Sequence, residues 1–243
     1  MKTKLLLIHG AWQGAWVWNN LQPLLEQQGI ETHTMDLPGS GYDTTPPDQV
    51  TLKTYAESII SKLESLGDKG SVSVVAHSMG GTAATEAASL RPDLFKKLIY
   101  LCAFCPQTGQ SVASLGKESH ELGTDGPQTE SGAEPKTVQL IPDSIKGTFF
   151  ADYTGDLRTI ETWVKQFRPQ PTTPITTPVT LSDGYRTLEK AYIVCTQDKA
   201  INPNLQRRMA KQANIDSVHT LDSGHEPFFT MPMKLSTLLI EQI

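Results

Sequence analysis

Short apolar runs alternate with longer amphipathic stretches along much of the chain. The apolar runs, rich in Leu, Ile and Val, are typical of strands buried on both faces of a parallel sheet. The stretches between them carry apolar residues at helical spacing, and several end at glycine, which commonly closes a helix. Strands are expected over 4–8, 30–36, 71–75, 97–104, 191–196 and 217–221. Helices are expected over 17–28, 52–66, 82–90 and 205–213, with a last one at the C-terminus. This alternation predicts an α/β fold, a mostly parallel sheet of about six strands with helices on both faces.

The alternation stops over residues 106–182. Glycine, proline and threonine dominate two parts of this segment, 123–136 and 169–178, and one helix is expected between them, around 159–167. An irregular loop of this length is unusual in a compact domain, so the pattern favours an inserted substructure.

A linker to a second domain is the alternative, but too few residues follow it to build another core. We therefore predict one core made of residues 1–105 and 183–243. Residues 106–182 are expected to form a cap, or lid, over the carboxyl ends of the strands, where ligands bind in open α/β sheets.

One serine lies between a predicted strand and a predicted helix, in Ala76-His77-Ser78-Met79-Gly80-Gly81. The motif is similar to the G-x-S-x-G nucleophile elbow, with Ala76 in the place of the first glycine. Small residues are needed there because the backbone folds tightly and holds the serine in a strained conformation. A purely structural turn is the other interpretation, but the flanking strand and helix favour a catalytic serine.

A serine hydroxyl needs a base to take its proton, and the base needs a third group to hold it. His225 follows the last predicted strand, so it can reach Ser78 at the carboxyl edge of the sheet. The acid is expected between them in chain order, and Asp198 follows an apolar strand there. Asp222 is too close to His225 in sequence to approach it from another strand end. The predicted triad is Ser78, Asp198 and His225.

Two backbone N–H groups are expected to stabilise an oxyanion. One belongs to Met79 at the start of a helix, and the other to Ala11 in the loop after the first strand. His9 is expected to orient that loop, and His77 to point away from the serine. An apolar substrate pocket is expected from aromatic residues, for each of which core packing is the alternative. These residues are Trp12, Phe149, Trp163, Phe167 and Phe228.

Composition and net charge argue against several classes of binding partner. The net charge is −5 and no basic cluster stands out, so neither nucleic acid nor a membrane surface is an expected partner. The three cysteines cannot all pair, which favours a reduced, cytoplasmic setting. The apolar run at the N-terminus is too short for a signal peptide and is interpreted as the first strand. Neither metal-ligand spacing nor a phosphate or dinucleotide motif is present, so no cofactor and no metal are expected.

Taken together, the motifs resemble those of the α/β-hydrolases. Within that superfamily the chain is similar to the plant methyl esterases, salicylate-binding esterases and hydroxynitrile lyases, with their bacterial esterase relatives. The matching segments are 8–18, 21–26, 35–41, 76–81 and 192–199. The resemblance implies an α/β-hydrolase fold, the triad of Ser78, Asp198 and His225, and oxyanion donors at Ala11 and Met79. Many such proteins are dimers, so a homodimer is one expectation.

Three functions fit these residues. The first is a serine hydrolase that cleaves small carboxylic esters through an acyl-enzyme, and the second is a hydroxynitrile lyase. The third is a slow or non-catalytic ligand sensor on the same fold. The resembling lyases carry threonine after the first-strand histidine and lysine after the catalytic histidine, whereas this chain has Gly10 and Glu226. A negative charge at Glu226 has the wrong sign to stabilise departing cyanide. Both differences favour the ester hydrolase.

Overall fold

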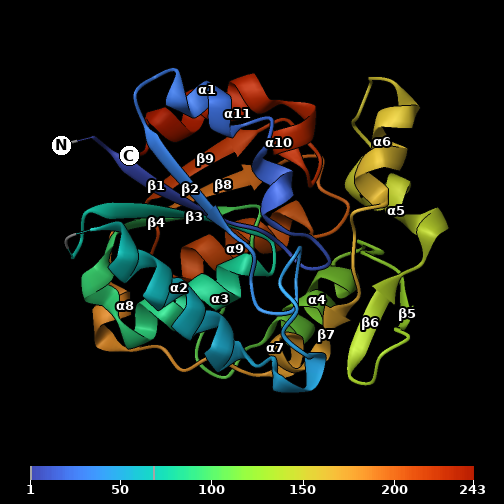
Figure 1. The fold of residues 1–243 in the computed structure, drawn as a ribbon, viewed down its shortest axis with the longest axis horizontal. Helices are drawn as coiled ribbons and strands as arrows, with labels where there is room; N and C mark the ends of the chain where they lie inside the picture. Colours follow the sequence, from blue (N-terminus) through green and yellow to red (C-terminus); the bar gives the residue numbers. More distant parts are fainter. Residues whose placement is uncertain (1, 68) are drawn as a thin grey trace.

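Six parallel strands form the central sheet of the computed structural model, which describes residues 2–67 and 69–243 (Figure 1). Across the sheet the strands are β2 (Glu31–Met35), β1 (Lys4–Ile8), β3 (Val72–His77), β4 (Phe95–Leu101), β8 (Lys190–Cys195) and β9 (Ser217–Leu221). Every neighbouring pair is parallel, with Leu7 of β1 opposite Val75 of β3, for example. The predicted α/β sheet is confirmed.

Successive residues of the four inner strands, β1, β3, β4 and β8, face opposite layers of helices. Leu6 and Ile8 pack into one core, while Leu5 and Leu7 pack into the other. The first layer holds α2 (Leu52–Leu66), α3 (Gly80–Leu90), α8 (Asp183–Thr187) and α9 (Pro203–Gln212). The second holds α1 (Gln22–Glu26), α10 (Pro227–Thr230), α11 (Pro232–Ile240) and a 3₁₀ turn at Ala15–Trp18. Because side chains alternate across a strand, these apolar runs bury both faces.

Helix α2 shows how local sequence sets an element. Thr51 and Thr54 form a reciprocal capping box at its start, and Gly67, with φ at +141°, follows its end. Its buried side chains recur three or four residues apart and pack against α3 and the sheet. The expected bounds of this helix and of strands β1 and β9 match the structure.

Most other expected bounds differ from the structure by one or two residues, and two elements differ by more. The helix expected over 17–28 is instead a 3₁₀ turn followed by the short α1, because Pro23 has no N–H to donate and is placed only in the first turn of a helix. The strand expected to reach residue 104 ends at Leu101, because Cys102 takes a left-handed conformation with φ at +35°.

The segment 106–182 lies beyond the carboxyl ends of the strands (Figure 1). It contains α4 (Val112–Glu121), β5 (Thr129–Ser131), β6 (Thr137–Leu140), α5 (Pro142–Phe149), α6 (Leu157–Val164), β7 (Gln170–Pro171) and α7 (Thr172–Thr176). The three strands form a small antiparallel sheet. Helix α6 overlaps the one expected around 159–167; the other elements were not expected. The role of this segment as a cap stays a prediction.

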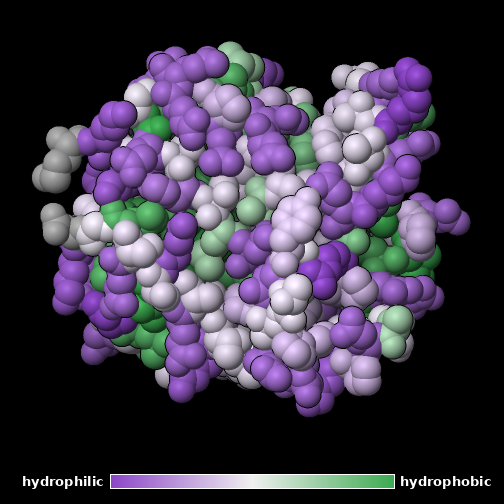
Figure 2. Space-filling model, viewed as in Figure 1, coloured by the Kyte–Doolittle hydropathy of each residue, from purple (hydrophilic) through white to green (hydrophobic). Residues whose placement is uncertain are grey.

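Hydrophilic residues cover most of the face seen in Figure 2, and hydrophobic residues show mainly in the recesses between them. Short 3₁₀ turns at Pro47–Gln49 and Pro92–Leu94 complete the fold. Over residues 2–67 and 69–243, no helix combines the length and apolar character needed to cross a membrane.

Candidate active site

Ser78 occupies the sharp turn between β3 and α3. Its φ is +54°, in the left-handed region that L-residues rarely adopt. The turn fits because α3 begins on two glycines: a Cβ on Gly80 would lie 2.4 Å from the carbonyl oxygen of His9. A Cβ on Gly81 would lie equally close to the carbonyl oxygen of Phe104. Only glycine lets the helix start this near both neighbouring strands, and this packing holds Ser78 at the strand end.

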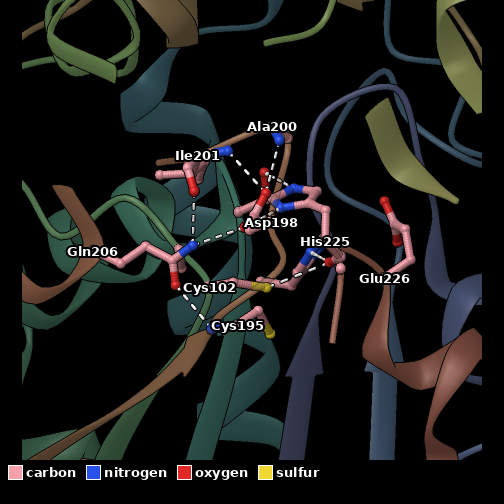
Figure 3. A network of polar contacts seen from close by, with 12 residues as sticks. Cys102, Cys195, Asp198, Ala200, Ile201, Gln206, His225 and Glu226 are labelled. Atoms are coloured by element: carbon pink, nitrogen blue, oxygen red, sulfur yellow. Dashed lines mark hydrogen bonds and ion pairs between the residues drawn. The ribbon is translucent and has the colours of Figure 1, made fainter. Parts of the chain in front are cut away.

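His225 links Ser78 to Asp198. Its Nε2 is 3.0 Å from Ser78 Oγ. Its Nδ1 is 2.8 Å from Asp198 Oδ2, and Figure 3 shows these two side chains side by side. Ser78 follows β3, Asp198 follows β8 and His225 follows β9, so the three side chains meet at the carboxyl edge of the sheet. The structure therefore brings together the three residues expected from the sequence, and all are buried.

Asp198 accepts hydrogen bonds at both oxygens. Oδ1 accepts from the N–H groups of Ala200 and Ile201, and Oδ2 accepts from Nε2 of Gln206 as well as from His225 (Figure 3). These contacts fix the carboxylate against the imidazole ring. Sequence reasoning missed Gln206, because a glutamine inside an amphipathic helix gives no signal that it faces inward.

Asp222 takes no part in this chain of contacts. It accepts hydrogen bonds from the side chains of Thr196 and Gln197 on the surface. The side-chain hydrogen bonds of Gln197 and Thr196 lower the pKa of Asp222 below its usual value. The choice of Asp198 over Asp222 thus agrees with the geometry.

Two buried side chains contact the backbone carbonyl of His225. His77 Nε2 donates to the His225 carbonyl at 2.9 Å, and Cys102 Sγ approaches the same oxygen at 3.4 Å. Burial holds the pKa of His77 well below its usual range, and the nearby His225 lowers it further, so His77 is neutral. His77, Cys102 and His225 are the one group of possible metal ligands found in the described part of the chain. The ring of His225 is already bonded to Asp198 and Ser78, while His77 and Cys102 both contact its backbone carbonyl, so we assign His77 and Cys102 to positioning His225.

The loop after β1 is pinned beside Ser78. His9 Nδ1 donates to the Gly10 carbonyl, and His9 Nε2 accepts from the N–H of Leu37. Trp12, with φ at +63°, donates its N–H to Gln170 of β7. These contacts place His9 in the loop-orienting role expected from the sequence.

Ala11 and Met79 line the same cavity as Ser78. Within the residues that the structure describes, neither backbone N–H donates a hydrogen bond. Free N–H groups next to a nucleophile are suited to receive a developing oxyanion.

A cavity of about 410 Å³ opens over Ser78 and His225. Its walls come from the loop after β1 and from the segment 106–182, which includes α4. Apolar side chains predominate: Trp12, Phe104, Val112, Val138, Phe149 and Ile175. Trp12 and Phe149 lie where the sequence analysis placed them, and the Phe149 ring lies 5.6 Å from the ring of His225.

Three aromatic residues expected in the pocket lie elsewhere, and these assignments are corrected. Trp163 stacks on Phe229 at 4.1 Å between ring centroids. Phe167 packs edge-on against Trp16 and lines a separate, smaller cavity. Phe228 is fully buried. In each case the ring packs among the apolar side chains of the second helix layer. Sequence spacing cannot distinguish such a position from one in the pocket.

The expectation for Glu226 also changes. Its side chain is fully buried, outside the cavity, and its Oε1 accepts a hydrogen bond from Gln13 Nε2 at 2.7 Å. Burial raises the pKa of Glu226 well above its usual value, which favours the protonated acid. Because the side chain is buried away from the cavity, it does not face a substrate, and the argument from the sign of its charge does not hold.

Comparison with known proteins gives relatives along nearly the whole chain. Methylesterase 7 of Arabidopsis thaliana is 30% identical over 252 residues, covering 98% of this chain and 95% of the relative. An alpha-hydroxynitrile lyase of the same plant is 28% identical, covering 96% and 94%. The structure of polyneuridine aldehyde esterase is similar in fold, with a TM-score of 0.86 at 21% identity, covering 100% and 99%. These relatives confirm the resemblance to methylesterases and hydroxynitrile lyases.

A match to the alpha/beta hydrolase family spans residues 5–236. That range includes the elbow serine, the loop after β1 and both predicted partners of the serine. The chain belongs to the alpha/beta hydrolase family.

Proposed function

We propose that this protein is a serine hydrolase that cleaves small carboxylic esters through an acyl-enzyme intermediate. The observation that carries the proposal is the buried chain of hydrogen bonds from Ser78 through His225 to Asp198. A serine, a base and an orienting acid in this arrangement are the parts that nucleophilic acyl transfer requires. Methylesterases among the relatives support the same reaction class.

In the first half of the reaction, Ser78 Oγ attacks the ester carbonyl while His225 Nε2 takes its proton. The N–H groups of Ala11 and Met79 stabilise the oxyanion, and Asp198 stabilises the imidazolium. His225 then gives the proton to the departing alcohol, which leaves an acyl group on Ser78. In the second half a water molecule, deprotonated by His225, releases the acid and restores the serine.

Gly10 favours this reaction over cyanohydrin cleavage. A Cβ at position 10 would lie 2.9 Å from both Ser78 Cβ and His77 Nδ1. The threonine that the resembling lyases carry there does not fit unless these groups move. The bare backbone of Gly10 leaves room for a carbonyl oxygen between the two N–H donors.

The test compares two reactions in one preparation. We expect p-nitrophenyl acetate and small methyl esters to be hydrolysed, and mandelonitrile to release cyanide no faster than the Ser78→Ala protein does. Serine-dependent cyanide release with no hydrolysis across an ester panel would overturn the proposal. A wild-type protein that binds esters but turns over none would favour the sensor.

Phe149 is expected to set the preference for the acyl group, because its ring walls the cavity next to His225. Phe149→Ala should change the ratio of kcat/KM between p-nitrophenyl esters of a bulky aromatic acid and of acetic acid by about 10-fold or more. Trp163→Ala, which removes an aromatic ring outside the cavity, is the matched control and should keep that ratio within about 2-fold. Equal effects of both variants would contradict the assignment of the cavity.

The setting and assembly stay proposals. All three cysteines are free and buried, which supports a reduced, cytoplasmic setting. The homodimer rests on the resemblance alone, and the segment 106–182 is proposed as the cap that encloses the substrate.

A further inference from the structure

Glu226 is a fully buried acid next to His225 that the proposed reaction leaves without a role. It lies on the side of His225 away from Asp198 in Figure 3. Oε1 accepts the hydrogen bond from Gln13, while Oε2 is buried without a hydrogen-bond partner among the described residues. Buried acids with an unpartnered oxygen are costly, so this one calls for an explanation.

Gln13 carries the contact to the loop after β1. Its side chain is buried, and its Oε1 accepts from the N–H of Gly10 at 3.2 Å. Gly10 packs directly against Ser78 and precedes Ala11. A continuous set of hydrogen bonds therefore runs from the residue after His225 to the residue before the proposed oxyanion donor.

The protonation state of Glu226 suits this contact. Burial raises its pKa strongly, and the facing carboxylates of Asp198 and Asp152 raise it further. The thiols of Cys102 and Cys195 lie near enough for Glu226 to affect them, and burial raises the pKa of both. The protonated form, which burial favours, can accept a hydrogen bond from the Gln13 amide at one oxygen without bringing a charge beside the triad.

We propose that Glu226 and Gln13 form a positioning pair that fixes the N–H of Ala11 relative to His225 and Ser78. The inference rests on the proposed ester hydrolysis. An oxyanion contact is made in the transition state, so a loose loop lowers kcat while leaving substrate binding nearly unchanged. Neither residue touches the substrate.

Kinetics of Gln13→Ala, Glu226→Ala and the double variant test the pair. Each single variant should lose about 10- to 100-fold in kcat with KM within about 2-fold. Because both residues act through one contact, the kcat of the double variant should lie within about 3-fold of the kcat of the less active single variant. Glu226→Gln keeps a carbonyl acceptor for Gln13 and should restore kcat to within about 3-fold of the wild type.

A second readout does not depend on turnover. Hydrogen exchange of a peptide covering residues 9–13 should speed up in Gln13→Ala and Glu226→Ala, while β3 stays protected. Tyr185→Phe removes a different buried hydrogen bond, between Tyr185 and Tyr100, and serves as the control for general loss of stability. It should change neither kcat nor exchange in the loop.

The protonation of Glu226 gives a pH dependence with a defined sign. An acid whose folded-state pKa is raised contributes stability below its unfolded pKa, and that contribution is lost as pH rises towards the folded value. Glutamine cannot ionise. The Tm advantage of Glu226→Gln over wild type should therefore grow by about 3 °C or more between pH 5 and pH 8.

The outcomes separate the two proposals. Wild-type turnover that requires Ser78 tests ester hydrolysis by itself, and loop exchange tests the pair even without turnover. Wild-type kcat and loop exchange in both Gln13→Ala and Glu226→Ala overturn the pair and leave the hydrolase proposal standing. If the losses in kcat from Gln13→Ala and Glu226→Ala combine fully in the double variant, as they do for independent sites, the proposed pair is overturned as well.

Discussion

Replacing Ser78 with alanine is expected to reduce ester turnover to near background, a loss of about 10⁴-fold or more in kcat. Oγ is the atom that forms the acyl-enzyme, and among the described contacts it bonds to His225 alone. Removing it takes away the nucleophile while leaving the packing of the elbow in place. The measurement is kcat on p-nitrophenyl acetate together with the Tm of the purified variant.

Ser73→Ala is the matched control for this experiment. Ser73 lies on the same strand, is fully buried, and its hydroxyl has no hydrogen-bond partner in the described part of the chain. That variant should keep wild-type turnover. A Ser78→Ala protein that retains a tenth of the wild-type kcat would remove the serine from the mechanism.

Asp198→Asn is expected to lower kcat by about 10⁴-fold. An asparagine whose NH₂ group takes the place of Oδ2 cannot accept hydrogen bonds from His225 Nδ1 and Gln206 Nε2. The imidazole is then free to take the wrong tautomer. The variant should also lose stability, because a donor now faces two donors in a buried site.

Asp222→Asn is the matched control, since it replaces a carboxylate after the neighbouring strand that bonds only to surface side chains. It should retain activity and stability. If Asp198→Asn were active and Asp222→Asn inactive, the assignment of Asp198 as the acid would be wrong.

The three triad residues could be predicted from the sequence because each of them follows a strand. The residues after β3, β8 and β9 meet at one edge of a parallel sheet, so reading the strands placed Ser78, Asp198 and His225 together. The supporting residues could not be predicted in this way. Gln206 and Gln13 look like ordinary polar positions, and only the folded chain shows that both are buried.

Aromatic residues and the middle of the chain were harder to predict. Trp163 and Phe228 looked like pocket residues because apolar character does not say which neighbour will cover a ring. The elements of 106–182 are short and held by contacts distant in sequence, such as the pairing of β6 with β7. Glu226 shows the same limit for charge: the sequence does not show that its side chain is buried outside the cavity, where burial raises its pKa and favours the neutral form.

Formation of an acyl-enzyme on Ser78 is the central claim, and labelling with a fluorophosphonate followed by peptide mass spectrometry tests it most directly. The account predicts one equivalent of label, located on Ser78, with loss of ester hydrolysis in proportion to labelling. Label on another serine, or full hydrolysis by protein labelled at Ser78, would contradict it.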